Sequence, residues 1–566
     1  MPASLTTSPS SSARWPYLAL VAAVALAYWP TLRAPFLFDD TAAIVRNPTI
    51  RQLASFAVFS PPTDGGTTTG RPLVNFTFAL NYALSGEHPW SYHALNVVIH
   101  ALAALTLFGL VRRTLVAPVF GGRFTTAAPM LAFFSALLWA VHPLLTESVA
   151  CAAQRTESLC GLFYLLTLYA LARGPNSPRW LALSFTTCLL GMATKEVMVT
   201  APLLVLLYDR TFGAGSFSAA LRARSRYYAA LAATWLVLAV LVARAGGARG
   251  SAAGFALGVS PWTYLLTQCE ALVLYLKLAL WPHPLVLDYG NAVAASLADV
   301  WWQAAAIVAL LAFTVWALIR RPVLGFAAAW FFLILAPSSS FVPLVTQTIA
   351  EHRMYLPLAG LLVGLVLAIH RALGSRVWAV LVTATVLAGG VTYARSRDYT
   401  SEIAIWQGNV AARPHARTLT ALGVALLHAG RAADALPYFA RALALDPSHL
   451  SAERNRALAL LQLGRAPEAA TILATLPARE PGEAEEFFRL GNAFVREEKF
   501  AEAAAAYQRT LRLQPAHAAA HANLGNVLLL QGRTSEAIAE YEAVIRLRPD
   551  DARARENLQL AREARR

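Results

Sequence analysis

The chain of 566 residues is 57% hydrophobic, has a mean hydropathy of +0.49 and carries only 14% charged residues. Water-soluble proteins average roughly 45–50% apolar and about 25% charged residues, so a water-soluble protein and a disordered chain are both excluded. The net charge of +15 is uneven, because residues 1–413 carry 27 basic and 14 acidic side chains, whereas residues 414–566 carry 20 and 18. Basic cytoplasmic loops of a membrane protein account for that excess. We therefore expect no nucleic acid as a partner.

Apolar runs long enough to cross a bilayer recur as far as residue 393 and predict eleven spans, since a membrane helix needs about 17–25 residues. The runs lie near 16–32, 92–111, 127–145, 157–172, 180–193, 197–208, 228–243, 301–319, 323–342, 354–370 and 377–393. A twelfth run, 262–281, contains Glu270 and Lys277 and lies between two prolines. We interpret this run as interfacial or re-entrant.

Arginine placement favours eleven spans over twelve. With eleven, one side of the membrane holds Arg112, Arg113, Arg123, Arg173, Arg179, Arg210, Arg222, Arg224, Arg226, Arg320, Arg321, Arg371 and Arg376. Counting 262–281 as a span would move the last four to the other side, and basic short loops are typical of the cytoplasmic face. We therefore expect a cytoplasmic tail at 1–15, a transmembrane domain at 16–393 with a large external loop at 33–90, and an external C-terminal part.

The C-terminal part is a repeat array with a period of 34 residues. The recurring positions are Pro447, Pro481, Pro515 and Pro549; Ala435, Ala469, Ala503 and Ala537; Gly423, Ala457, Gly491 and Gly525; and Phe439, Leu473, Tyr507 and Tyr541. This pattern resembles tetratricopeptide repeats, in which each unit is a pair of antiparallel helices that is stable only when stacked on its neighbours. We expect a linker at 394–413, four repeats at 414–550, a capping helix at 551–566 and a concave surface for an extended segment.

Acidic residues of the membrane part gather on the external side of the eleven-span topology. They are Asp39, Asp40, Asp64, Glu87, Glu147, Glu196, Asp288, Asp299, Glu351, Asp398 and Glu402. Glu157 lies just inside an outer helix end, and only Asp209 is clearly cytoplasmic. Charges at membrane depth are costly and usually functional. The chemistry is therefore expected on the external side.

The first candidate motif is the pair Asp39-Asp40, directly after the first span. Two adjacent carboxylates can orient and deprotonate a hydroxyl, or hold a metal whose shell is completed by water. The alternative is a simple N-cap for a helix over residues 41–45.

Further candidates place cations among these acids. Arg155 at membrane depth suits a lipid phosphate, although an arginine can also snorkel to the interface. Lys195 and Glu196 are either an ion pair or a phosphate-facing lysine held by its glutamate. His142 has no partner in an H-x-x-x-H spacing, which argues against zinc. The remaining candidates are Glu147, Glu351, Arg353, Arg71 and Asp288. The combination suits a lipid-linked phosphate as leaving group and an acceptor hydroxyl that loses its proton.

Several motifs in this order resemble one family. They are F-D-D at 38–40, R-P-L-x-N-x-x-F-x-L-N-Y at 71–82, P-W-x-x-H-x-x-N-x-x-x-H at 89–100, H-P-x-x-T-E at 142–147, K-E at 195–196, D-Y-G at 288–290 and E-H-R-x-Y-L-P at 351–357. Followed by the repeats, they resemble the transmembrane O-mannosyltransferases with tetratricopeptide repeats (the TMTC group), which are GT-C glycosyltransferases. The resemblance implies an all-α fold, a polytopic GT-C helical bundle followed by a repeat solenoid.

The resemblance also implies a chemistry, namely transfer of a sugar (mannose in this family) from a polyprenyl-phosphate donor with inversion at C1. Asp39 and Asp40 then take the catalytic position, and either one accepts the proton of a Ser/Thr hydroxyl. Arg155, Lys195, Arg353 and His142 are expected to bind the donor phosphate. Glu147, Glu196, Glu351, Arg71 and Asp288 are expected to orient these cations or the sugar. A divalent metal stays open.

The arginine-rich, short form looks bacterial. This points to an undecaprenyl-type donor, an exported protein as acceptor, and the bacterial inner membrane with the site and the array on the periplasmic side. The alternatives are transfer of another sugar to a lipid or envelope glycan, and a non-catalytic membrane-anchored scaffold. A transporter would place its charges near mid-membrane, not at one face.

Overall fold

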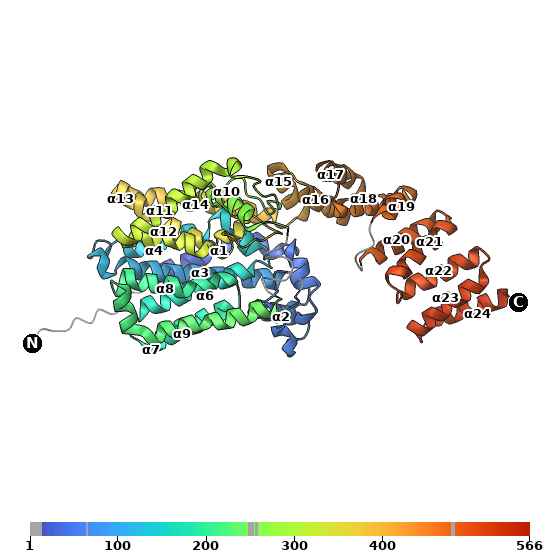
Figure 1. The fold of residues 1–566 in the computed structure, drawn as a ribbon, viewed down its shortest axis with the longest axis horizontal. Coiled ribbons are helices and arrows are strands. Elements are labelled where there is room, and N and C mark those ends of the chain that lie inside the picture. Colours follow the sequence, from blue (N-terminus) through green and yellow to red (C-terminus); the bar gives the residue numbers. More distant parts are fainter. Residues whose placement is uncertain (1–13, 64–65, 247–253, 255–257, 477–481, 566) are drawn as a thin grey trace, which may run out of the picture. The chain divides into compact units, whose positions relative to one another are not determined.

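The computed structural model describes residues 14–63, 66–246, 254, 258–476 and 482–565, which fall into two compact units divided between Ala412 and Arg413. All regular elements in these residues are helices, which confirms the predicted all-α fold class (Figure 1). The predicted tail at 1–15 lies almost wholly outside the described residues, as does Asp64.

The first unit is a bundle of helices, several of which begin with proline at the first helical turn, where its missing N–H is not needed. Its α-helices are α1 (Trp15–Ala27), α2 (Pro72–Ser85), α3 (Trp90–Leu115), α4 (Ala128–Ala140), α5 (Thr146–Ala150), α6 (Arg155–Arg173), α7 (Pro178–Met192), α8 (Ala201–Tyr208), α9 (Phe217–Arg244), α10 (Pro261–Leu280), α11 (Trp301–Arg320), α12 (Pro322–Leu335), α13 (Pro357–Leu373), α14 (Val377–Asp398) and α15 (Glu402–Ala412).

Among the described residues, five helices are long and apolar enough to cross a membrane: α3, α9, α10, 297–320 and 357–398. A sixth is formed if α4 and residues 143–150, bent by 52°, count as one span. Shorter apolar helices such as α1 and α12 accompany them. The chain is thus a multi-pass membrane protein, and the number of eleven spans stays a prediction.

The loops that hold the arginines meet at one end of the bundle, which we call the arginine end. Arg224 donates to Asp209 at 2.5 Å and to the Pro175 carbonyl at 2.7 Å, which joins the loops after α6 and α8. Arg210 donates to the carbonyl of Leu318 near the end of α11. Asp209, the one acid expected on the cytoplasmic side, is therefore paired at this end.

The predicted external loops meet at the opposite end, which we call the carboxylate end and which holds α2 (Figure 1). There the loops after α1, α5, α7 and α12 contact one another, as the site below describes. The run predicted as interfacial or re-entrant forms the single 20-residue helix α10. Its Tyr264 donates to Ser338, its Gln268 donates to Thr348, and the carbonyl of Ala279 contacts His142. Because α10 is also long and apolar enough to cross a membrane, its interfacial or re-entrant position stays a prediction.

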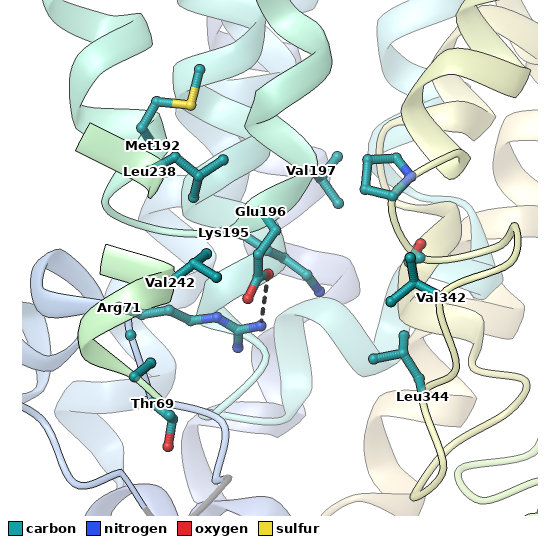
Figure 2. A pocket seen from close by; sticks show the side chains of 14 residues that line it. Thr69, Arg71, Met192, Lys195, Glu196, Val197, Leu238, Val242, Val342 and Leu344 are labelled. Carbon is teal, nitrogen blue, oxygen red and sulfur yellow. Dashed lines mark hydrogen bonds and ion pairs between the residues drawn. The ribbon is translucent and has the colours of Figure 1, made fainter. Parts of the chain in front are cut away.

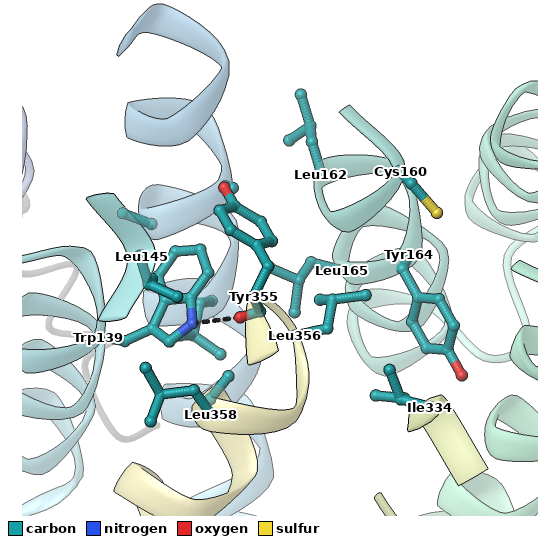
Figure 3. Packing of buried hydrophobic residues seen from close by; sticks show 14 of the residues in the cluster. Trp139, Leu145, Cys160, Leu162, Tyr164, Leu165, Ile334, Tyr355, Leu356 and Leu358 are labelled. Atoms are coloured by element: carbon teal, nitrogen blue, oxygen red, sulfur yellow. Dashed lines mark hydrogen bonds between the residues drawn. The ribbon is translucent and has the colours of Figure 1, made fainter. Parts of the chain in front are cut away.

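An aromatic cluster at the core holds distant helices together (Figure 3). The indole N–H of Trp139 in α4 donates to the carbonyl of Tyr355 at 2.8 Å, and their rings meet edge to face at 5.0 Å. The Tyr355 hydroxyl lies 2.8 Å from Nδ1 of His100 in α3. A Cβ at Gly161 of α6 would collide with the Tyr355 ring, so a residue without a side chain suits this approach. The segment that precedes α13 is thereby fixed against α3, α4 and α6.

The second unit consists of paired helices that follow the 34-residue period. They are α16 (Ala416–His428), α17 (Ala432–Leu445), α18 (Leu450–Gln462), α19 (Ala466–Thr475), α20 (Gly482–Arg496), α21 (Phe500–Leu513), α22 (Ala518–Leu530), α23 (Thr534–Leu547) and α24 (Ala552–Ala564).

The two helices of each pair cross where the recurring small residue meets the recurring ring. A Cβ at Gly491 would lie 2.5 Å from the Tyr507 ring, and one at Gly525 would lie 2.8 Å from the Tyr541 ring. The second copy departs from the pattern at both positions together, with Ala457 in place of glycine and Leu473 in place of the aromatic residue. The smaller Leu473 side chain leaves room for the extra methyl group, so the two departures compensate.

This compensation yields a prediction. Gly491→Ala should destabilise the third pair by about 1–3 kcal/mol, because the methyl group overpacks against Tyr507. Hydrogen–deuterium exchange of α20 and α21 in the full chain should therefore accelerate. Adding Tyr507→Leu, which reproduces the Ala457–Leu473 combination, should restore most of the protection, and unchanged exchange in the single variant would contradict the proposed packing.

Candidate functional site

The two adjacent aspartates begin the site, and the structure gives them different surroundings. The preceding residue, Phe38, has φ of +50°, a backbone conformation that non-glycine residues adopt at a cost and that clusters at functional sites. Asp40 is fully buried and accepts hydrogen bonds from the backbone N–H groups of Ala153 at 2.6 Å and Leu37 at 3.0 Å. Its side chain does not cap the following helical turn, so the N-cap interpretation is wrong. Asp40 instead ties the first loop to the loop after α5.

Asp39 keeps a partly exposed carboxyl. Gln154 donates to it at 3.4 Å, and the Thr67 hydroxyl is a second donor. Shielding from water and the neighbouring charges of Asp40, Glu147 and Asp288 raise the pKa of Asp39 to about 7, although the Thr67 hydrogen bond opposes the shift. Of the two aspartates, Asp39 is therefore the one placed to exchange a proton near neutral pH.

A network of alternating charges, which we call the charged network, extends from Asp39 across the carboxylate end. The Thr67 carbonyl accepts a hydrogen bond from Arg71 at 2.5 Å, and Arg71 pairs with Glu196 at 3.3 Å. The residue before Glu196, Lys195, pairs with Glu157 of α6. Lys195 and Glu196 thus each have a partner from another segment.

His352 closes the charged network on the side of the aspartates. Its Nδ1 lies 2.7 Å from Glu147, its backbone N–H donates to the same carboxylate at 3.2 Å, and its Nε2 lies 3.7 Å from Glu157. The negative charge of Glu147 in turn acts on Asp39. Polar side chains from the loops after α1, α7 and α12 and from helices α5 and α6 are therefore held together.

A cavity of about 180 Å³ opens beside this network (Figure 2). Arg71, Lys195 and Glu196 form its polar side, and the side chains of Leu238 and Val242 from α9 line one wall. Met192, Val342 and Leu344 add further apolar surface. A cavity with two carboxylate-paired cations on one side and apolar side chains around it can accept an anionic group attached to a hydrocarbon chain.

Glu351 and Asp288 form a second part of the site. Glu351 is buried and accepts hydrogen bonds from the backbone N–H of Val286 at 2.5 Å and from the Tyr289 hydroxyl at 2.8 Å. It therefore orients the loop that carries Asp288, whose charge acts on Asp39. Asp288 itself accepts the Gly290 N–H at 2.9 Å, which shapes the turn.

Helix α15 contacts both the loop that carries Asp39 and the loop that carries Asp288. Trp406 packs edge to face against Phe38 with ring centroids 5.7 Å apart. Asn409 accepts a hydrogen bond from the backbone N–H of Leu287 at 2.7 Å. The helix that ends the first unit thus contacts the residue before Asp39 and the residue before Asp288.

Arg155 does not fit the predicted role of a phosphate ligand. It is fully buried and donates to the side chains of Asn96, Asn81 and Thr77 and to the carbonyl of Tyr92, at 2.7–3.1 Å. Its guanidinium also lies 4.7 Å from the centre of the Phe78 ring. These contacts saturate the cation with protein groups, so it joins α2, α3 and α6.

Arg353 and His142 are saturated in the same way. Arg353 donates to the carbonyls of Ser338 and Thr348 at 3.1 Å and of Gln347 at 2.5 Å, so it braces the segment after α12. His142 accepts the Leu144 N–H and contacts the Ala279 carbonyl. Neither side chain contributes to the cavity described above. The carbonyl partners could not be foreseen because they come from segments with no regular spacing to the two residues.

Two charged residues in this region had no role in the sequence-based prediction. Glu157 pairs with Lys195, and Arg395 of α14 lies at the carboxylate end, where its positive charge acts on Glu351. The sequence signal for Glu157 was an acidic residue within an apolar run, because a charge at that depth requires a partner.

Within the described residues no three His, Cys, Asp or Glu side chains form a cluster suited to a metal ion.

The contacts of Arg155 predict that its loss is structural. Arg155→Lys should lower the free energy of unfolding by about 2–3 kcal/mol, because lysine cannot satisfy the four acceptors in one plane. The unfolding temperature in detergent, measured without any donor, should fall, whereas the exposed control Arg376→Lys should leave it unchanged. Normal stability of Arg155→Lys combined with a raised KM for a polyprenyl-phosphate donor would restore the phosphate role.

Comparison with known proteins finds similarity to tetratricopeptide repeats and to protein O-mannosyl-transferases. Tetratricopeptide repeat models match residues 426–490 and 488–552. Protein O-mannosyl-transferase TMTC3 of Mus musculus is 33% identical over 203 residues, which cover 34% of this chain and 21% of the relative. Protein O-mannosyl-transferase Tmtc2 of Drosophila melanogaster is 31% identical over 322 residues, 53% of this chain and 33% of that protein.

A longer match is to protein O-mannosyl-transferase F38B6.6 of Caenorhabditis elegans, 26% identical over 460 residues, 76% of this chain and 63% of that protein. Each of these three matches therefore spans less than two thirds of the relative's own length. Together with the repeat models and the apolar helices, they show a multi-pass membrane protein that is similar to the TMTC protein O-mannosyl-transferases and carries C-terminal tetratricopeptide repeats.

Proposed function

We propose that the chain is a GT-C-type membrane glycosyltransferase. It moves a sugar, mannose by analogy with its relatives, from a polyprenyl-phosphate donor to Ser/Thr hydroxyls of exported proteins. The observation that carries the proposal is the link through Thr67, whose hydroxyl bonds Asp39 and whose carbonyl bonds Arg71 of the cavity. A carboxylate suited to proton transfer thereby lies next to a cationic cavity with apolar walls.

The cavity supports a lipid phosphate as the donor's leaving group. Lys195 and Arg71 supply positive charge, while Glu157 and Glu196 fix the positions of these two cations. The apolar side chains of α7 and α9 accommodate the first part of a polyprenyl chain, whose remainder lies in the bilayer. Undecaprenyl phosphate is the expected carrier.

In the proposed reaction, Asp39 accepts the proton of the acceptor hydroxyl while the hydroxyl oxygen forms a bond to C1 of the sugar. The bond between C1 and the phosphate oxygen breaks, and polyprenyl phosphate leaves with the bonding electron pair. Attack opposite the leaving group inverts C1. Lys195 and Arg71 stabilise the charge that develops on the phosphate, which is commonly the largest catalytic contribution. No step uses a metal ion.

The same contacts support the proposed sidedness. Trp406 and Asn409 lie at the carboxylate end, so the chain leaves the membrane unit on the side of Asp39. The arginine end is expected to face the cytoplasm. We therefore place the site and the repeat array in the periplasm of a bacterium, with the protein in the inner membrane and the array available to an exported acceptor.

Asp39→Asn should lower kcat by about 10²–10⁴-fold, because the amide cannot accept the hydroxyl proton. The assay uses the full chain in nanodiscs, a polyprenyl-phosphate mannose and a Ser/Thr peptide, with the configuration at C1 read by NMR. Glu87→Gln serves as the matched control, since Glu87 is an exposed acid of the same loop that pairs with Arg51.

Asp40→Asn should reduce both the rate of transfer and the thermal stability. Each carboxylate oxygen of Asp40 accepts one backbone N–H group, and asparagine retains only one of these two acceptors.

Undiminished transfer by Asp39→Asn would remove Asp39 from the mechanism. If wild-type protein transfers no sugar from any polyprenyl-phosphate donor and truncation of the array alone abolishes its cellular role, the protein is a scaffold.

The pKa of Asp39 predicts a pH dependence. Because the base must be deprotonated and its pKa is about 7, kcat/KM should rise about tenfold per pH unit below neutrality and level off above pH 7. The donor is a phosphodiester and does not titrate in this range. Asp40→Asn removes a neighbouring negative charge, so the midpoint should move to lower pH; a flat profile for the wild-type protein would contradict the assignment.

A further inference from the structure

The repeat unit contains a cavity of about 580 Å³. The first helices of the first three pairs, α16, α18 and α20, form it. Leu458 and Leu461 supply apolar surface, and Asn492, Arg489 and Arg496 supply polar groups.

The amide of Asn492 is held in one orientation. Its side-chain oxygen accepts hydrogen bonds from the Tyr507 hydroxyl at 2.7 Å and from Nδ2 of Asn523 at 2.8 Å. Oxygen and nitrogen of an amide point in opposite directions, so the two N–H donors of Asn492 face away from these partners.

The same arrangement recurs once, 34 residues later, whereas the first two copies carry Val424 and Leu458 at this position. The side-chain oxygen of Asn526 accepts hydrogen bonds from the Tyr541 hydroxyl at 2.7 Å and from Nδ2 of Asn557 at 3.2 Å. Each tyrosine is the ring that packs on the recurring glycine. In the third and fourth copies the repeat packing therefore uses the amide oxygen of this asparagine and leaves its amide N–H groups as donors.

Two arginines add positive charge to the cavity. Arg489 and Arg496 are exposed cations of the cavity, and Arg489 pairs with Glu485 at 3.3 Å. Among the described residues that line the cavity there is no Asp or Glu. Asn455 also lines the cavity, and because its Nδ2 donates to the Ser451 carbonyl at 2.8 Å, its amide oxygen is left as an acceptor. The surface thus offers positive charge together with amide donors and an amide acceptor, which suits a negatively charged ligand with both N–H and carbonyl groups, as a peptide backbone has.

We propose that this cavity binds an extended, acidic, Ser/Thr-containing segment of the exported acceptor protein. Backbone carbonyls meet the amide N–H groups, and Asp or Glu side chains meet Arg489 and Arg496. A nucleic acid fits less well, because residues 414–566 carry only two more basic than acidic side chains. The inference rests on the proposed function for the origin of the segment, but its binding chemistry rests on the array alone.

The test measures binding by fluorescence anisotropy with the full chain in nanodiscs of neutral lipid. The probe is a labelled peptide of alternating Asp and Ser, and the matched peptide has Asn in place of Asp. The acidic peptide should bind at least about tenfold more tightly, with an affinity that falls as salt rises. Equal affinity for the two peptides, or equal binding of single-stranded DNA, would overturn the proposal.

Variants separate the cavity from general charge. The double variant Arg489→Gln/Arg496→Gln should weaken binding about tenfold, whereas Arg465→Gln, an exposed arginine paired with Glu468 outside the cavity, should not. Asn492→Asp retains the acceptor for Tyr507 but replaces the N–H donors with a negative charge, so it should also weaken binding. An equal loss in the Arg465 control, or none in Asn492→Asp, would contradict the inference.

Binding is also measured in the Asp39→Asn background to keep the two proposals distinct. If this variant binds the acidic peptide while the wild-type protein transfers no sugar, the cavity assignment holds and the catalytic one fails. If sugar transfer proceeds without any preference for acidic acceptors, the proposed function holds and the cavity assignment fails.

Discussion

Charges buried at the carboxylate end must be paired, and this requirement arranges the loops around them. Lys195 pairs with Glu157 and Arg71 pairs with Glu196, and Glu147 accepts a hydrogen bond from the backbone N–H of His352; in each case the partners come from different segments. An isolated charge there would carry a large desolvation cost, so the partners hold their segments in register. Asp39 and the cavity keep their relative positions because Thr67 and Arg71 belong to the same arrangement.

The same requirement separates cations that support the fold from cations that can meet a ligand. Arg155 and Arg353 have their donors satisfied by carbonyl, hydroxyl and amide oxygens, and they brace helices and loops. Arg71 and Lys195 are held by carboxylates yet still line the cavity. A substrate phosphate can share a carboxylate-held cation, whereas displacing a carbonyl from a buried guanidinium leaves a polar group without a partner.

Helix α15 shows that the end of the membrane unit belongs to the site. Trp406 packs against Phe38, the strained residue before Asp39, and Asn409 fixes the backbone before Asp288. The sequence-based division assigned residues 394–413 to a linker between the two units. Its role depends on two contacts to loops that lie far away in the chain.

The sequence alone determined the helical class, the 34-residue repeat and the grouping of acids and arginines at opposite ends, because each depends on local periodicity or on short-loop charge. It also singled out Asp39, Lys195 and Arg71 as residues of one region. Only the tertiary structure decided which aspartate is free to exchange a proton, that Glu157 is the partner of Lys195, and that Arg155, Arg353 and His142 are saturated. Those roles depend on carbonyl and side-chain partners brought from distant segments, and the identity of a residue does not specify which backbone groups will surround it.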